Sequence, residues 1–354
     1  VRFGGRRMPA AAALAAAGLE PIVLEAKEGL SLLNGTDVML AMVVLALDRA
    51  RRLADVSDLA CAMSVEALLG SARQFEARIH ELRPHPGQVD SARRIAGLLR
   101  DSEIVASHAD DFVHAVQDAY SLRCAPQVHG ATRDVFGQAA ATFGCELGAV
   151  ADNPLVFANG DAADVVSGGN FHGQPLAFAM DFMAIAATEL GSISERRTDR
   201  MLDPDRSAGL PAFLAATPGL DSGFMLAQYT AAALVAENRV LSHPASVESI
   251  PTSGLQEDHV SMGWGAGRKL EMVLDNTARV LAVELLCAAQ GIEMRAPLRS
   301  AASTAAALTA LRTVVPSLDE DRPIGGDIEA VAHAVESGLF DAVLAANEAG
   351  SGDG

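Results

Sequence analysis

Aromatic residues and lysines are scarce in this sequence. Only 4% of the 354 residues are aromatic and lysine occurs only at Lys27 and Lys269, whereas hydrophobic residues make up 50%. The apolar content is therefore mainly Ala, Leu and Val, and alanine is the strongest helix former. A chain this apolar is not disordered. The composition favours an all-α protein with a large core.

The sequence also has few positively charged residues and only short apolar runs. The formal net charge is −18, and since a phosphate backbone is bound by concentrated cations, we expect no nucleic-acid partner. The longest apolar run, residues 38–47, is too short to cross a bilayer. Arg6-Arg7 followed by alanines resembles a twin-arginine signal, but an ordinary surface helix is the better interpretation. We expect a cytoplasmic protein without a membrane partner.

Cysteine pairs and metal motifs are missing too. Cys61, Cys124, Cys145 and Cys287 lie far apart, which predicts free thiols in a reducing compartment. The nine histidines form no H-E-x-x-H motif and no Cys/His cluster, so no metal site is predicted. The glycines of residues 263–269 lie in a helical pattern and lack the Ser or Thr of a phosphate loop. They favour close helix packing instead.

Apolar residues recur every three or four positions along much of the chain. After Trp264, for example, Leu270, Leu274, Leu281 and Leu285 share one helix face. No run alternates in the way of a half-buried strand. The pattern therefore predicts a bundle of long helices, with further helical stripes at 38–53, 88–100, 131–150, 176–193, 223–241 and 328–339.

Proline and glycine mark the predicted boundaries. The sequence predicts a central helical bundle over residues 1–295, a C-terminal helical segment over 296–349 that packs on it, and a flexible tail over 350–354. Residues 203–223 are rich in Pro and Gly and are predicted to form a loop. Pro126 in Cys124-Ala125-Pro126 is predicted to end any preceding helix.

Three short polar patterns are candidates for chemistry. Gln117, Tyr120 and Arg123 follow one another at intervals of three, so one helical turn would point them roughly the same way. Residues 256–259 read Gln-Glu-Asp-His before a long apolar helix, and residues 34–36 read Asn-Gly-Thr. Each pattern alone is typical of an exposed turn or a helix cap.

Read in order, these patterns and their flanks resemble a known family. The sequence resembles the aromatic amino-acid ammonia-lyases, and among them the histidine-specific members, from Leu19 to about Gly291. The stretches that carry the resemblance are Glu25–Thr36, Gln117–Gly130, Ser167–His172, Ser194–Arg200, His243–Ser253 and Gln256–Gly263.

The resemblance implies a fold and a reaction. The expected fold is an all-α, long-helix bundle of the ammonia-lyase or fumarase-like type, assembled as a homotetramer whose active sites combine several subunits. The expected reaction is non-oxidative loss of ammonia, which turns L-histidine into trans-urocanate. The family uses an electrophilic prosthetic group, methylidene-imidazolone, made from an Ala-Ser-Gly tripeptide, and needs no metal.

The resemblance also implies roles for individual residues. Tyr120, beside the prosthetic group, and Glu257, against the substrate imidazole or ammonium, would be catalytic. Arg123 would bind the substrate carboxylate, because a planar two-donor fork suits a planar anion. The complete set of expected substrate-binding residues is Asn34, Gln117, Arg123 and Phe171.

One part of the family pattern is absent from the sequence. Ala-Ser-Gly does not occur in the 354 residues. In the family the tripeptide precedes the stretch that resembles residues 1–19. We therefore expect the C-terminal two-thirds of a member, without the N-terminal prosthetic-group domain. Such a chain would be inactive by itself and could work with a separate N-terminal chain.

Two alternative functions remain at this point. The first is a phenylalanine or tyrosine ammonia-lyase or aminomutase. Glu257 argues against it, because a carboxylate buried against a phenyl ring would have no partner. The second is a catalytically dead helical oligomer that acts as a scaffold. The retained Asn34, Tyr120 and Arg123, together with Glu257, argue against that one.

Overall fold

The computed structural model describes residues 1–109 and 116–350. Its strands are β1 (Arg2–Phe3), β2 (Arg6–Arg7), β3 (Leu155–Asn159) and β4 (Ala162–Val166). Its α-helices are α1 (Ala10–Ala16), α2 (Glu28–Asn34), α3 (Asp37–Ala67), α4 (Ala77–His80), α5 (Pro86–Leu98), α6 (Glu103–Ala106), α7 (Tyr120–Arg123), α8 (Ala125–Glu146), α9 (Gln174–Leu202), α10 (Met225–Leu241), α11 (Gly263–Glu293), α12 (Ala302–Arg312), α13 (Gly325–Glu336) and α14 (Asp341–Gly350). Short 3₁₀ turns are η1 (Arg73–Phe75), η2 (Ala212–Leu214) and η3 (Ser253–Leu255).

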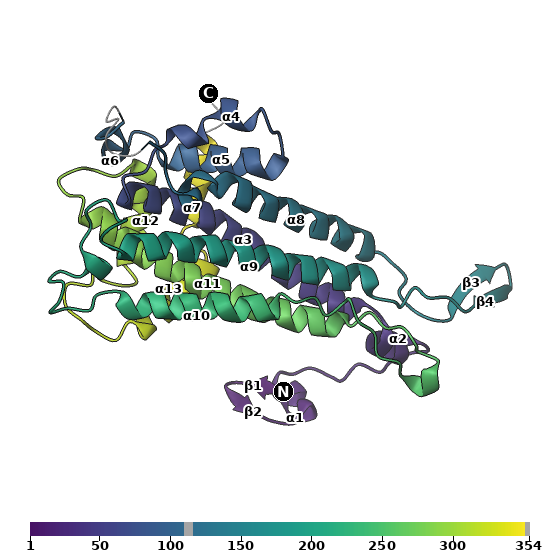
Figure 1. The fold of residues 1–354 in the computed structure, drawn as a ribbon. Helices are drawn as coiled ribbons and strands as arrows, with labels where there is room; N and C mark the ends of the chain where they lie inside the picture. The colour runs from purple at the N-terminus through teal and green to yellow at the C-terminus, as the bar shows by residue number, and fades with distance from the viewer. Residues whose placement is uncertain (110–115, 351–354) are drawn as a thin grey trace. The chain divides into compact units, whose positions relative to one another are not determined.

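Long helices lie side by side in a bundle, which confirms the predicted all-α fold (Figure 1). Helices α9 and α11 run in the same direction, because Asp181 pairs with Lys269 near their starts and Arg197 with Glu284 near their ends. Helices α8 and α10 run the opposite way along α9. The chain therefore enters α8 at the end of the bundle where α9 finishes. The link from α10 to α11 lies at the end where α9 begins.

The centre of the core is formed by the C-terminal halves of α3 and α11. Nearly every residue of 53–67 and of 280–292 is buried, and a helix that is apolar on all sides is stable only when other helices surround it. Small residues allow α3 and α11 to approach each other closely. A Cβ at Gly267 would lie 2.7 Å from the Met42 side chain. The glycines of residues 263–269 thus serve packing, as predicted.

One feature differs from the sequence-based expectation. Strands β3 and β4 form an antiparallel hairpin in register Leu155 to Val166, although no strand pattern was found. Its strands are almost wholly exposed, so they lack the apolar alternation that a half-buried strand shows. The signal that could have found it is Gly160-Asp161 between them, with Gly160 at φ +59°.

The helix that precedes Pro126 ends where the sequence predicts, because α7 stops at Arg123. Pro126 itself lies in the first turn of α8. Proline is favoured there because the first-turn N–H groups have no partner within the helix. The break between α7 and α8 therefore occurs at Cys124.

The described chain divides into two compact units. The smaller comprises residues 1–38 and 149–172, and the larger residues 39–148 and 173–354. The predicted boundary at residue 295 stays a prediction. Helices α12 to α14 belong to the larger unit, where α13 packs on α11 and α14 on α5. Helix α14 ends at Gly350, and residues 351–354 of the predicted tail lie outside the described residues.

Among the described residues, one single helix is long and apolar enough to be compared with a membrane span. Helix α9 passes on length and hydropathy, yet 72% of its most apolar window is buried inside the protein. That burial is typical of a core helix in a bundle.

Candidate functional site

A single helical turn, α7, carries two of the predicted site residues. Leu122 is buried and anchors the turn, whereas the Tyr120 side chain is 71% exposed. The backbone N–H groups of Leu122 and Arg123 both donate to the Ala119 carbonyl, which closes the turn. The tyrosine ring and the arginine therefore project from a fixed backbone into the space outside the core.

Arg123, Gln117 and Tyr120 form one cluster. The Nη1 of Arg123 donates to the Gln117 side-chain oxygen, and its Cζ lies 4.8 Å from the centre of the Tyr120 ring. A cation over an aromatic face is attracted to it, so the ring and the amide together orient the guanidinium plane. Within the described residues the other guanidinium nitrogens have no acceptor. A two-donor edge is thus available to a carboxylate. Gln117 joins the cluster although α7 begins only at Tyr120.

Glu257 lies in the exposed link between α10 and α11. Thr252 and Glu257 pair across η3, and the Thr252 hydroxyl donates to the Glu257 carboxylate at 2.6 Å. Hydrogen bonds from the Thr252 and Ser253 hydroxyls hold the pKa of Glu257 below its usual range. The group is therefore an anion at neutral pH, ready to accept from an N–H donor.

Glu257 and Tyr120 lie toward opposite ends of the bundle in one chain. The Arg197 side chain reaches the Ser121 carbonyl in α7, and a Cβ at Gly173 would lie 3.4 Å from the Ser261 hydroxyl. Positions 173 and 197 are separated by about 36 Å along the helix axis. The four residues from Ser261 to Glu257 can span at most about 14 Å, so they can bring Glu257 back toward α7 by no more than that. Along the helix axis about 20 Å thus separates the two positions within one chain, before the reach of the connecting side chains is counted.

Asn34 and Phe171 belong to the smaller unit. Asn34 ends α2, and the following Gly35 packs against the Ala151 carbonyl. Asn170, next to Phe171, donates to the Val150 carbonyl at 3.3 Å. Both candidates therefore flank the same stretch of chain, residues 150–154, and both side chains are exposed.

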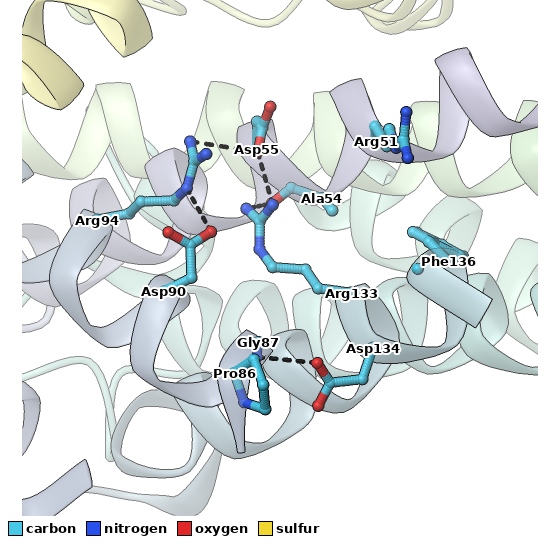
Figure 2. Close-up of a pocket in the computed structure, with 11 residues that line it drawn as sticks. Arg51, Ala54, Asp55, Pro86, Gly87, Asp90, Arg94, Arg133, Asp134 and Phe136 are labelled. Carbon is cyan, nitrogen blue, oxygen red and sulfur yellow. Dashed lines mark hydrogen bonds and ion pairs between the residues drawn. The ribbon is translucent and has the colours of Figure 1, made fainter. Parts of the chain in front are cut away.

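Two cavities lie in the larger unit. A cavity of about 410 Å³ lies between α3, α5 and α8 and contains none of the predicted residues (Figure 2). Its charged groups pair with one another, as Arg133 and Arg94 both do with Asp55. A second cavity, of about 360 Å³, is lined by Gln117 together with Asp118 and Arg200. It is the one that adjoins the candidate cluster.

Behind α7 lies a set of charged residues that sequence reasoning assigned no role. We call Asp58, His129, Arg197 and Glu284 the buried charge network; all four are fully buried. Arg197 donates to both oxygens of Glu284, at 2.5 and 2.9 Å, and His129 Nδ1 lies 2.8 Å from Asp58. The position of Arg197 in the helical repeat could have indicated its burial. Arg197 falls on the stripe of α9 that also holds Leu190, Ile193 and Met201, so its side chain had to face the core.

The pKa values of the network favour a neutral histidine beside a carboxylate. Burial lowers the pKa of His129. Burial opposes ionisation of Asp58, but Arg133 and His129 outweigh it and lower that pKa. His129 Nε2 lies 3.4 Å from Arg197 Nη1, and a guanidinium can only donate. The ring proton is therefore assigned to Nδ1, facing Asp58.

With this geometry defined, comparison with known proteins identifies the family. The model of the aromatic amino acid lyase family matches residues 1–313. The chain belongs to the aromatic amino acid lyase family. Its members are ammonia-lyases and related enzymes, so the chain derives from carbon–nitrogen lyases.

Individual lyases match most of the chain. Histidine ammonia-lyase of Gloeobacter violaceus is 55% identical over 97% of this chain and 66% of its own length. The crystal structure of histidine ammonia-lyase from Trypanosoma cruzi superposes with a TM-score of 0.86 at 46% identity, covering 95% of this chain and 63% of that one. Tyrosine aminomutase from Streptomyces globisporus gives 0.89 at 41% identity, covering 98% and 68%. The chain thus spans about two thirds of the length of the lyases it matches.

Proposed function

We propose that this chain forms part of a histidine ammonia-lyase, which converts L-histidine into trans-urocanate and ammonia. The observation that carries the proposal is the 55% identity over 97% of the chain to a protein of that name. The Arg123–Gln117–Tyr120 cluster supports it, because its free guanidinium edge suits the carboxylate of an amino acid. Glu257 supports histidine among the amino acids, since an ionised carboxylate suits an imidazole N–H.

The proposed reaction divides the work between these residues. A Cβ–H and the Cα–N bond of L-histidine break, a Cα=Cβ double bond forms, and the amine leaves as ammonia. Arg123 holds the carboxylate, and Gln117 keeps the guanidinium plane in place. Tyr120 presents its hydroxyl to the reacting side of the substrate, where it can move a proton or orient the amine. Glu257 accepts a hydrogen bond from the imidazole or ammonium.

The methylidene-imidazolone group of the family supplies an electrophile when it is present, and its Ala-Ser-Gly precursor does not occur in this sequence. The residues present would therefore only surround the group. Asn34, Tyr120 and Phe171 suit that task. Neither the Asn34 amide nor the Tyr120 hydroxyl hydrogen-bonds to another described residue, and the Phe171 ring is 39% exposed. We propose that a segment outside these 354 residues supplies the tripeptide.

Assembly is part of the proposal, because Tyr120 and Glu257 are far apart in one chain. Only residues from different subunits could then enclose one substrate. Exposed apolar side chains on α9 support association: Phe178, Phe182 and Ile185 share one face and are 42%, 50% and 45% exposed. An oligomer would cover them.

Urocanate production tests the proposed function. The purified chain is incubated with L-histidine and urocanate is followed by its ultraviolet absorbance, first alone and then produced together with a segment that carries Ala-Ser-Gly. We expect no product from the chain alone and urocanate from the combination. Product from the chain alone would contradict the need for the tripeptide. If the combination deaminated or isomerised L-tyrosine or L-phenylalanine and not L-histidine, the aminomutase or ammonia-lyase alternative would replace this proposal.

A further inference from the structure

The Arg197 side chain connects the core of the bundle to the turn α7. It is fully buried and lies on α9, which packs against α7, α8 and α11 (Figure 1). Its Nε and Nη2 bind the Glu284 carboxylate, and its Nη1 donates to the Ser121 carbonyl at 3.2 Å. Ser121 lies between Tyr120 and Leu122. The guanidinium thus holds the backbone of the residue next to a candidate catalytic tyrosine.

Core stability alone does not explain a guanidinium at this place. Burying two opposite charges is costly, and replacing a buried ion pair by apolar side chains is often neutral or stabilising. The donor to Ser121 is the part of Arg197 that an apolar residue could not replace. A carbonyl at the end of a one-turn helix otherwise has no partner inside that helix.

The turn has few other means of holding its position. A four-residue helix is not stable by itself, since helix nucleation is costly. Of its residues only Leu122 is buried, and Tyr120 is largely exposed. The orientation of the Arg123 guanidinium and the Tyr120 hydroxyl therefore depends on the contacts of the α7 backbone with the bundle.

The rest of the buried charge network restricts Arg197 itself. His129 Nε2 lies on the remaining side of the guanidinium, and His129 is held by Asp58. Asp58 in turn accepts from Arg133 at 2.5 Å, and Arg133 lines the charged cavity of Figure 2. On the other side the Ser64 hydroxyl donates to Glu284 at 2.7 Å. The guanidinium consequently has one available orientation, which points Nη1 at α7.

We propose that Arg197 is a positioning residue that holds the Tyr120–Arg123 turn in the orientation needed to bind the substrate carboxylate, through its hydrogen bond to the Ser121 carbonyl. The role in substrate binding rests on the proposed function. The contact by which Arg197 holds α7 in place does not depend on that function.

The four cysteines allow the contact between Arg197 and α7 to be tested in the isolated chain, without enzyme activity. Cys124 directly follows α7, Cys145 is exposed near the far end of α8, and Cys61 and Cys287 are fully buried. Burial raises the pKa of Cys61 to about 12, so it reacts only if the core opens. Alkylation by iodoacetamide, resolved for each cysteine by mass spectrometry, then reports local and global opening in one sample.

Arg197→Lys keeps the charge beside Glu284 but removes the fork that also reaches Ser121. We expect the alkylation rate of Cys124 to rise at least about tenfold, with Cys61 and Cys287 still protected and Cys145 unchanged. The double variant Arg197→Met with Glu284→Leu removes both charges and serves if the lysine variant fails to fold. It should expose Cys124 in the same way. Ser64→Ala is the matched control, because it takes one hydrogen bond from Glu284 and leaves the Ser121 contact intact.

The outcomes separate positioning from general stability. An unchanged Cys124 rate in the arginine variants overturns the proposal, and so does an equal rise at Cys61 and Cys287 or an equal effect of Ser64→Ala. In the enzyme assembled with the tripeptide segment, Arg197→Lys should raise KM for L-histidine several-fold, whereas loss of folded enzyme alone would lower kcat at constant KM. An unchanged KM beside an exposed Cys124 overturns the role in substrate binding. Absence of urocanate in the unsubstituted assembly would instead refute the proposed function, and the alkylation result would stand separately.

Discussion

At the scale of single residues, the distinction between Arg123 and Arg197 organises the site. Arg123 ends the turn α7 and Arg197 binds its backbone, but Arg123 is partly exposed with free donors, whereas Arg197 is fully buried with all three guanidinium nitrogens engaged. A partly exposed guanidinium with a free edge binds ligands, and a saturated one holds structure. Their roles therefore differ although their side chains are the same.

Arg123→Ala should remove most of the substrate carboxylate binding in the assembled enzyme. A charge-assisted pair of hydrogen bonds contributes about 3 kcal/mol, so kcat/KM for L-histidine should fall about a hundredfold. Arg123→Lys should recover only part of it, because an ammonium lacks the planar fork. Arg78→Ala, which removes an exposed arginine paired with Glu76, is the control and should leave kcat/KM unchanged. Near-normal activity of Arg123→Ala would refute the carboxylate role.

His129 should make stability depend on pH in a defined direction. Burial lowers its pKa in the folded protein, whereas the unfolded chain titrates near its ordinary value of about 6.5. Between the two values the unfolded state binds more protons, so stability rises with pH and this contribution is complete above about 6.5. A proton added at Nε2 would face the Arg197 guanidinium, while Asp58 and Glu284 supply the nearby negative charge.

Denaturant unfolding between pH 5.5 and 7.5 measures this dependence. The unsubstituted chain should lose stability toward the acid end more steeply than His129→Gln, in which the titrating ring is removed. His80, whose pKa burial also lowers, is present in both proteins and cancels in the comparison. Equal slopes would show that His129 does not titrate as described.

At the scale of helices, the sequence pattern was sufficient to predict an element wherever that element buries an apolar face. The apolar stripe from Leu270 to Leu285 predicts α11, because only a helix places those residues on one side. The β3–β4 hairpin was missed since its exposed strands carry no such stripe. Spacing predicted that Gln117, Tyr120 and Arg123 point roughly the same way; they cluster, although Gln117 lies outside α7. The Arg197 hold on α7 was not predicted. It joins residues 76 positions apart, and no local pattern encodes which buried arginine meets which carbonyl.

The crossing of α5 and α8 depends on two glycines in contact. A Cβ at Gly130 would lie 2.2 Å from the backbone nitrogen of Gln88, and one at Gly87 would lie 2.1 Å from the Gly130 carbonyl oxygen. Gly130→Ala should therefore force the helices apart and lower the free energy of unfolding by about 3 kcal/mol or more. Gly137→Ala, on the same helix with open space around it, should raise that free energy by up to about 1 kcal/mol. Similar effects of the two substitutions in denaturant unfolding would contradict this packing.

At the scale of the whole molecule, the exposed aromatic face of α9 should drive self-association. Phe178 and Phe182 stack with ring centres 5.7 Å apart, and both are half-exposed in the single chain. Phe182→Glu would place a charge in the covered interface and should shift the sedimentation profile toward monomer. Leu82→Glu is the control, because Leu82 lies on an exposed turn outside α9. A monomeric unsubstituted chain would refute the expected assembly.

The proposed active site takes Arg123 and Glu257 from different subunits, and mixing two defective proteins tests this sharing. Enzyme carrying Arg123→Ala and enzyme carrying Glu257→Gln, each assembled with the tripeptide segment, should both be severely impaired in forming urocanate. If each site takes Arg123 and Glu257 from different chains, dissociating and reassembling an equal mixture should leave about a quarter of the sites with both residues intact. We expect urocanate formation to recover to about that fraction of the unsubstituted rate. No recovery above the average of the two separate variants would contradict it.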